Sequence, residues 1–209
     1  DDGDEGWGVA GRAVYSPLIG ENQRLHVGVS AEYREPKSDD RVSFSSRPEI
    51  HLIDRRMIST GTLSGVDYTV TSGIELAGVW GPWSLQGEYL RTDVRRTGRP
   101  DQRFPGWCLF GSWFIAGGRR NYDPKDGAFD QVEPTGAYGA WEVAVRYSVL
   151  DLEDDPITGG KEENWTLGLN WYLSRKIRFM FNYIRAEVKD RRTTPAVPAG
   201  DANFFQMRF

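Results

Sequence analysis

The sequence predicts an all-β fold, a transmembrane antiparallel β-barrel to which this chain contributes about nine strands. Three observations predict it. Alternation of apolar and polar residues with a period of two recurs along the chain, whereas helical periodicity is nowhere convincing. The alternating segments run about nine to twelve residues, longer than the five or six of a typical soluble strand. Aromatic residues stand at the ends of these segments, on the apolar face.

The clearest alternation lies in residues 141–149, whose odd positions are apolar or aromatic, whereas the even positions include Glu142 and Arg146. Residues 165–173 and 177–183 repeat the pattern. Residues 107–116 form a strand by composition, but Phe110 and Phe114 make both of its faces apolar. In chain order, the expected strands are residues 7–15, 24–34, 68–80, 83–94, 107–116, 140–149, 165–173, 177–183 and 203–209.

A soluble β-sandwich also alternates apolar and polar residues, so it is the competing fold. Strand length argues against it, because nine to twelve tilted residues suit a span of the hydrocarbon layer. The aromatic pairs argue the same way. Pairs such as Trp141 with Tyr147, and Trp165 with Trp171, fit two interfacial girdles roughly 20 Å apart. A sandwich would place its bulkiest residues in the middle of the core instead.

Composition excludes several classes of protein. The net charge of −4 gives no strong attraction to nucleic acid, so we expect no nucleic-acid partner. The single cysteine, Cys108, rules out an intrachain disulfide framework. No apolar run approaches the roughly 18 residues of a membrane helix. The acidic first residues lack the features of a signal peptide, so in an exported protein we expect the numbering to begin after processing or inside a longer chain.

The last residues, 203–209, form an apolar strand that stops at Phe209. This ending resembles the closing strand of bacterial outer-membrane barrels, where it also acts as an assembly signal. Placing Phe209 at the periplasmic end makes residues 81–82 and 174–176 short periplasmic turns. It makes residues 92–106, 152–163 and 189–201 long outer loops.

Two connections are less regular. Residues 35–65 are either one long outer loop or a loop with an extra hairpin, and we prefer the single loop, because a full hairpin arm would reverse the later strands. Residues 117–137 lie on the periplasmic side although they number about twenty, which suggests a plug-like or assembly role.

A family resemblance is carried by several motifs. The runs at residues 136–151, 159–173 and 178–183 look like the C-terminal half of the phosphate-selective porin O/P family. Supporting motifs include Arg47-Pro48-Glu49, Gln86-Gly87-Glu88-Tyr89 and Asn121-Tyr122. The resemblance implies that residues 1–209 are the C-terminal part of a single barrel domain of about sixteen strands. It also implies a homotrimer in lipid, in the outer membrane of a Gram-negative bacterium, and a channel for small anions such as phosphate.

The candidate ion path follows from the alternation and from the family's lumen arginines. The lumen candidates are Arg12, Arg34, Arg146, Arg178, Arg208 and Glu142. In one interpretation the arginines form a ladder that binds anions by bidentate hydrogen bonds. In the other they are neutralised across strands by the inward carboxylates Glu32, Glu75, Glu88 and Glu142.

No motif indicates catalysis, and we expect neither an enzyme nor a cofactor. Asp151 with residues 153–155 is either an acidic outer loop or a calcium site. His26 and His51 lack partners at ligand spacing, and Cys108 is expected to be a wall residue. Three functions remain open: a water-filled porin for small hydrophilic solutes, a small plugged barrel with a structural or adhesive role, and a soluble carbohydrate-binding sandwich.

Overall fold

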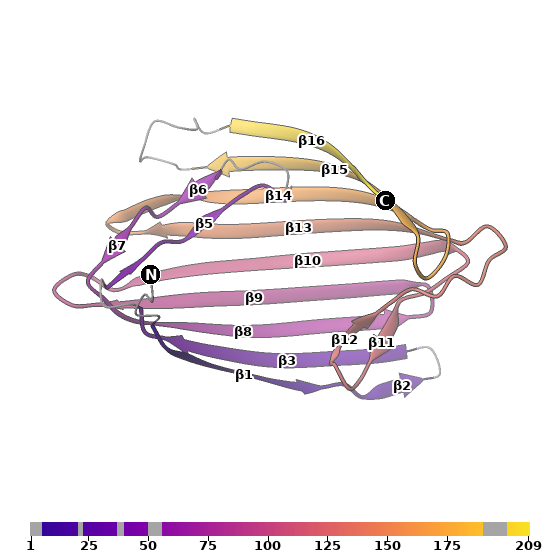
Figure 1. Ribbon diagram of the computed structural model, residues 1–209, viewed down its shortest axis with the longest axis horizontal. Coiled ribbons are helices and arrows are strands. Elements are labelled where there is room, and N and C mark those ends of the chain that lie inside the picture. Colours follow the sequence, from indigo (N-terminus) through magenta and orange to yellow (C-terminus); the bar gives the residue numbers. More distant parts are fainter. Residues whose placement is uncertain (1–5, 21–22, 37–39, 50–55, 190–199) are drawn as a thin grey trace, which may run out of the picture.

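The computed structural model describes residues 6–20, 23–36, 40–49, 56–189 and 200–209. Nine long strands of these residues form one antiparallel sheet in chain order, and the short strand β2, Leu18–Gly20, pairs with β3 beyond the end of β1 (Figure 1). The long strands are β1 Gly8–Tyr15, β3 Gln23–Arg34, β8 Val66–Trp80, β9 Trp83–Arg96, β10 Gln102–Ala116, β13 Ala140–Asp154, β14 Ile157–Tyr172, β15 Arg178–Lys189 and β16 Gly200–Arg208. The prediction of about nine strands is confirmed.

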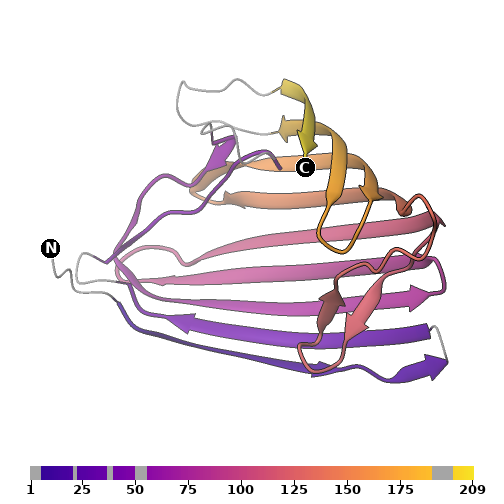
Figure 2. The same cartoon turned by 45° about the vertical axis from the view of Figure 1, so that its right-hand side comes forward.

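The sheet is a curved trough (Figure 2). Within the described residues it is open, since β1 pairs with β3 and β16 pairs with β15 but the two edge strands do not pair with each other. We call the end of the sheet at which β3 ends at Arg34 and β8 begins at Val66 the loop end, and the end that carries the turn at Gly81 the turn end. Gly81 has a φ of +57°, which suits a residue without a Cβ in a tight turn. The described residues include no helix long and apolar enough to cross a membrane.

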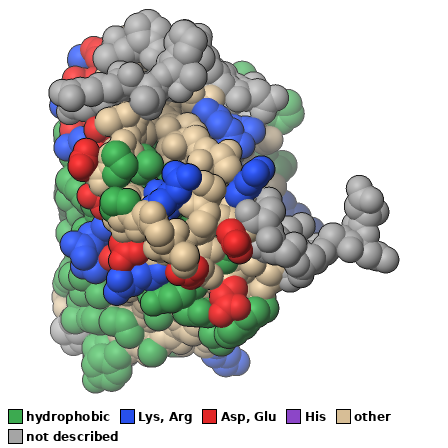
Figure 3. Space-filling model, turned by 90° about the vertical axis from the view of Figure 1, so that its left-hand side faces the viewer, with side chains coloured by type: hydrophobic (Ala, Val, Ile, Leu, Met, Phe, Trp, Pro, Cys, Tyr) green, Lys and Arg blue, Asp and Glu red, His purple; other side chains and the backbone are tan. Residues whose placement is uncertain are grey.

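The two faces of the sheet differ as the alternation predicts. Val143, Val145 and Leu167 are exposed on the convex face, whereas Glu142 and Asn170, at the alternate positions, are buried on the concave face. In Figure 3 hydrophobic side chains cover the left margin of the molecule, and charged side chains of both signs are spread over the loop end that faces the viewer. A sandwich would cover the apolar face with a second sheet, and the described chain forms a single large one.

Aromatic side chains form two bands on the convex face. Toward the turn end, Trp83 stacks on Trp113, and Trp171 stacks between Trp141 and Phe179. These five rings lie on five neighbouring strands, β9, β10, β13, β14 and β15. Toward the loop end, the contacts join Trp107, Tyr147 and Trp165. The bands fit the two interfacial girdles that the sequence predicts.

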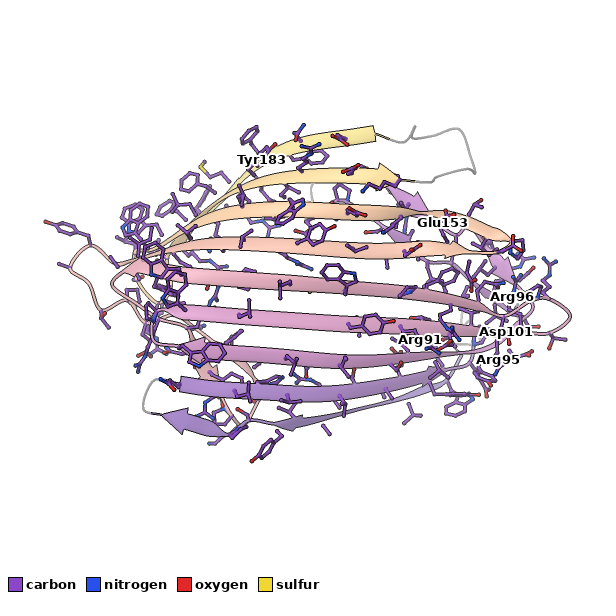
Figure 4. The ribbon with its side chains drawn as sticks, turned by 180° about the vertical axis from the view of Figure 1, so that it is seen from behind. Arg91, Arg95, Arg96, Asp101, Glu153 and Tyr183 are labelled. Carbon is purple, nitrogen blue, oxygen red and sulfur yellow. The ribbon has the colours of Figure 1, made fainter. Side chains whose placement is uncertain are left out.

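The prediction of long outer loops at residues 92–106 and 152–163 is wrong, because paired strands occupy most of both segments. β9 continues to Arg96 and β10 begins at Gln102, while β13 and β14 leave only a two-residue turn after Asp154. Beyond the loop-end aromatic band the outward positions become charged, so apolar alternation stops although pairing continues. Arg91 and Arg103 both pair with Asp93 there, at 2.9 and 3.0 Å. In Figure 4 the labelled Arg91, Arg95 and Asp101 gather at this end. Most of the third expected loop, residues 190–199, lies outside the described residues.

The described residues between 35 and 65 fold back over the concave face. The single loop that we preferred is wrong, and the alternative with an extra hairpin is correct: β4 Arg41–Val42 pairs with β7 Leu63–Ser64, and β5 Ser45–Ser46 pairs with β6 Ile58–Ser59. We call this segment the inward loop. Its apolar side chains cause the folding, because Ile58 and Leu63 become almost completely buried against the wall residues Val94, Phe104 and Leu152.

Residues 117–137, which we call the connector, also lie on the concave side. β11 Asn121–Asp123 and β12 Ala128–Asp130 form a hairpin beside β3 (Figures 1 and 2). Arg12 donates to the Gly127 carbonyl at 3.0 Å, and His26 Nδ1 lies 2.5 Å from the Tyr122 hydroxyl. The connector is long because it forms a hairpin that packs against the concave face of the sheet.

The connector also accounts for the second apolar face of residues 107–116. Phe114 is buried with Val132 of the connector, Ala140 and Tyr172, and the Arg120 guanidinium lies over the Phe110 ring. Because these phenylalanines are covered from within the chain, they carry no argument for contact between subunits.

Candidate functional site

A cavity of about 730 Å³ opens on the concave face, between the inward loop, the connector and the wall strands β13 to β16. The charged side chains that line it are almost all positive. Among the described residues, Glu49 is the one carboxylate in the lining. The arginines that line it are Arg47, Arg56, Arg120, Arg146, Arg178 and Arg208. This arginine cavity is the candidate functional site.

Three of the five predicted lumen arginines reach the cavity from the wall. Arg146, Arg178 and Arg208 come from β13, β15 and β16, where the alternation turns them to the concave side. The structure pairs no described carboxylate with Arg178 or Arg208. The Arg178 guanidinium lies 5.7 Å from the centroid of the Tyr172 ring. Arg208 lies 3.1 Å from the Gln206 amide oxygen when that amide faces it.

The other three arginines come from segments without periodicity, and reasoning from alternation missed them. Arg47 and Arg56 belong to the inward loop, where Arg56 donates to the Ser45 hydroxyl. Arg120 belongs to the connector. The only signal for them in the sequence is their basic character within two long connections, which does not say where those connections fold.

Glu142 faces the concave side, as predicted, but it is completely buried under the connector. One of its oxygens lies 2.7 Å from Arg120 Nη2, and the other accepts hydrogen bonds from Asn170 Nδ2 at 2.9 Å and Tyr172 OH at 2.8 Å. These contacts hold Arg120 at the cavity edge. Glu142 therefore neutralises Arg120 of the connector, whereas Arg146, on the same strand as Glu142, lies 3.2 Å from Glu49.

Arg12 and Arg34 lie elsewhere on the concave face, outside this cavity. Arg12 Nε lies 2.6 Å from Glu75 Oε1 below the connector hairpin. Arg34 pairs with Glu32 at 2.8 Å toward the loop end. The expected cross-strand neutralisation therefore describes Arg12, whose partner Glu75 lies on β8. Arg34 is neutralised within its own strand, because Glu32 also belongs to β3. The ladder interpretation fits Arg178 and Arg208 better.

The acidic residues considered for calcium are used within the chain. Asp151 and Glu153 accept the backbone amides of Glu153 and Gly160, and Asp154 accepts that of Arg103. No cluster of three or more His, Cys, Asp or Glu with metal-binding geometry occurs in the described part of the chain. His51 lies outside the described residues, and Cys108 is a half-buried residue of the β10 wall.

Comparison with known proteins decides the family. The profile of the family described as "Phosphate-selective porin O and P" matches residues 1–209, the whole chain. The chain belongs to this porin family. Its members are channels of the bacterial outer membrane rather than enzymes, and the long antiparallel strands with one apolar face fit a porin barrel wall.

Two relatives agree with this assignment. The chain is 36% identical to an uncharacterized protein of Caulobacter vibrioides over 191 residues, which cover 87% of this chain and 38% of the relative. It is 29% identical to Porin O of Pseudomonas aeruginosa over 207 residues, which cover 84% of this chain and 47% of the relative. This porin chain therefore spans less than half the length of the relatives it matches.

Proposed function

We propose that the full-length protein forms a water-filled channel for small hydrophilic solutes across the outer membrane, with a preference for anions such as phosphate. The observation that carries the proposal is the charge of the arginine cavity, with six arginines and one carboxylate among its described lining residues. The candidate ion path consists of Arg146, Arg178 and Arg208 on the wall, together with Arg120, which Glu142 positions.

Physical chemistry supports a preference for anions at this site. A guanidinium keeps its charge at any physiological pH, and its planar fork of donors matches the oxygens of phosphate. Arg178 and Arg208 have no ion-pair partner among the described carboxylates, so their fields act on solutes in the cavity. A cluster of one sign with low-dielectric walls raises the local concentration of counter-ions. The other predicted arginines, Arg12 and Arg34, are paired and contribute less.

The test is the reversal potential of the full-length protein in a planar bilayer under a KCl gradient. We expect a preference for chloride, and a shift toward potassium when Arg178→Gln and Arg208→Gln are combined. The matched control combines Arg34→Gln with Arg185→Gln, which removes the same charge from two arginines outside the cavity that pair with Glu32 and Asp201. A cation-preferring wild type, or equal shifts in the two double variants, would contradict the proposal.

A second candidate function is favoured by the packing on the concave face. The inward loop and the connector both fill part of the trough, each with its own apolar cluster. This arrangement also suits a small plugged barrel with a structural or adhesive role. Full-length protein that inserts into bilayers without measurable conductance would favour that function over the channel.

A further inference from the structure

We propose that Arg146, Ser148 and Thr166 form an oxyanion-binding site in the cavity wall, and that Glu49 of the inward loop occupies it as a tethered internal anion. We call these three wall residues the wall cradle. The inference deepens the proposed function, because it assigns one anion site within the arginine cavity and names a residue that competes for it. It rests on the proposed function for the access of solute anions to the cavity.

The geometry is that of an anion held by three donors. Arg146 Nε lies 3.2 Å from Glu49 Oε1, and the Ser148 hydroxyl donates to the same oxygen at 2.8 Å. The Thr166 hydroxyl donates to the other oxygen, Oε2, at 2.5 Å. Both carboxylate oxygens are therefore satisfied by one charged and two neutral donors of the wall.

The cradle and its occupant belong to separate elements. Arg146 and Ser148 are alternate residues of β13 on the concave face, and Thr166 is paired with Arg146 across the β13–β14 ladder. The register of the sheet therefore fixes the three donors without any contribution from Glu49. The inward loop supplies Glu49 from residues far away in the sequence. The wall can keep its donor arrangement when the loop carboxylate leaves.

The donor set suits a tetrahedral oxyanion such as phosphate or sulfate. The two oxygens of Glu49 stand in for two oxygens of such a ligand, which would accept the same hydrogen bonds. The site is also reachable, since the Arg146 side chain is 44% exposed beside the cavity while that of Glu49 is 17% exposed. Arg178, Arg208 and Arg120 line the same cavity and add attraction for an incoming anion.

Glu49 thereby sets the affinity of the cradle for solute anions. When a ligand can bind a site only while that site is unoccupied, its apparent Kd equals the intrinsic Kd divided by the unoccupied fraction. If Glu49 fills the cradle about nine-tenths of the time, the apparent Kd is about tenfold above its intrinsic value. A weakened site suits a channel, because a permeating ion has to leave as readily as it enters.

The experiment measures binding of inorganic phosphate to detergent-solubilised full-length protein by calorimetry, and block of chloride current by phosphate in bilayers. Glu49→Gln keeps the side-chain shape and removes the charge. We expect phosphate to bind about tenfold more tightly. Glu32→Gln is the matched control, because it removes an inward carboxylate that pairs with Arg34 outside the cavity, and its phosphate affinity should match the wild type. Glu49→Ala carries the same expectation if Glu49→Gln does not fold.

A combined variant separates the cradle from a loop that merely moves away. Adding Ser148→Ala and Thr166→Val to Glu49→Gln should return the phosphate affinity to the wild-type value or below. A larger conductance without tighter phosphate binding in Glu49→Gln would overturn the inference and leave the channel function standing. Tighter calorimetric binding in a protein without conductance would overturn the channel function and leave the cradle standing.

Discussion

Glu142 is a buried residue that positions a charged side chain of the arginine cavity, Arg120. It is completely buried, and its partners come from the connector and from the neighbouring strand β14. A buried carboxylate costs desolvation energy unless it is paired and hydrogen-bonded, and Glu142 has both an arginine and two neutral donors. The Arg120 side chain is itself only 17% exposed, so each of the two buried charges is stabilised by the other.

We therefore expect Glu142→Ala to destabilise the protein by about 3–5 kcal/mol, because it leaves the Arg120 charge without its buried partner. Unfolding by urea in detergent measures the change. The control is Glu88→Ala, whose carboxylate is only half-buried and accepts a hydrogen bond from Gln86. A loss for Glu142→Ala no larger than that for Glu88→Ala would contradict the prediction.

Val145 tests the assignment of the convex face at the level of one residue. It is exposed, and lies between the aromatic residues Trp141 and Tyr147 of its own strand. An arginine there should cost about 2–4 kcal/mol if the face meets lipid near the bilayer midplane. Folding in lipid vesicles, followed during urea titration, measures this cost.

Gln86→Arg is the matched control for Val145→Arg. Gln86 is level with Arg146 through their shared ladder partner Phe110, so it lies at nearly the same height as Val145 but on the opposite face. We expect it to be tolerated, because the concave face is wet. Equal losses for the two variants would show that the convex face does not meet lipid.

At the scale of elements, the connector hairpin is held to β1 and β3 by a few polar contacts. The Tyr122 hydroxyl lies 2.5 Å from His26 Nδ1, and the Arg24 guanidinium lies 5.2 Å from the centroid of the Tyr122 ring. His26 is buried and also lies 3.3 Å from Glu75. The hairpin therefore docks through a cluster of side chains rather than through a strand ladder.

Tyr122→Phe should loosen this hairpin, because it removes one hydrogen bond worth about 0.5–1.5 kcal/mol and leaves a buried imidazole nitrogen without that partner. Faster cleavage within residues 123–127 during limited proteolysis measures the effect. Tyr138→Phe is the control, because Tyr138 directly follows the connector and its side chain is 85% exposed, so the rate of cleavage should match the wild type. Unchanged cleavage in Tyr122→Phe would show that other contacts hold the hairpin.

At the scale of the whole molecule, the described chain is a wall with two free edges. In lipid, unpaired backbone groups are costly, so a spanning sheet has to close or pair its edges. The relatives that match this chain are more than twice as long, and their matched regions cover 38% and 47% of them. We expect further strands of a full-length protein to complete a barrel of about sixteen strands.

We also expect the full-length porin to be a homotrimer, on the strength of the family resemblance. Native mass measurement of the detergent-solubilised protein tests this, and a mass of the monomer alone would contradict it. Tryptophan substitution of residues within the cavity should leave the number of subunits unchanged, because the cavity lies on the concave face and a neighbouring subunit would contact the convex one.

The sequence by itself determined the nine long strands and which of their residues face outward. Period-two alternation is a local property, so it places Val145 outward and Arg146 inward whatever the rest of the chain does. The same parity brought Arg146, Arg178 and Arg208 to one wall. The predicted strands ended too early at the loop end. There, ion pairs such as Arg91 with Asp93 replace the apolar pattern while the strands continue.

Only the tertiary structure decided where the two long connections fold, and with them the composition of the site. Glu49 meets Ser148 and Thr166 across 99 and 117 positions of the chain, and Arg120 finds Glu142 from the connector. These contacts depend on burial of loop side chains such as Ile58 and Leu63 against a wall that exists only after the strands pair. Burial between segments far apart in the chain produces no periodic pattern in the sequence. Alternation therefore predicted the arginines of the cavity wall, but not the charged residues that the inward loop and the connector add to it.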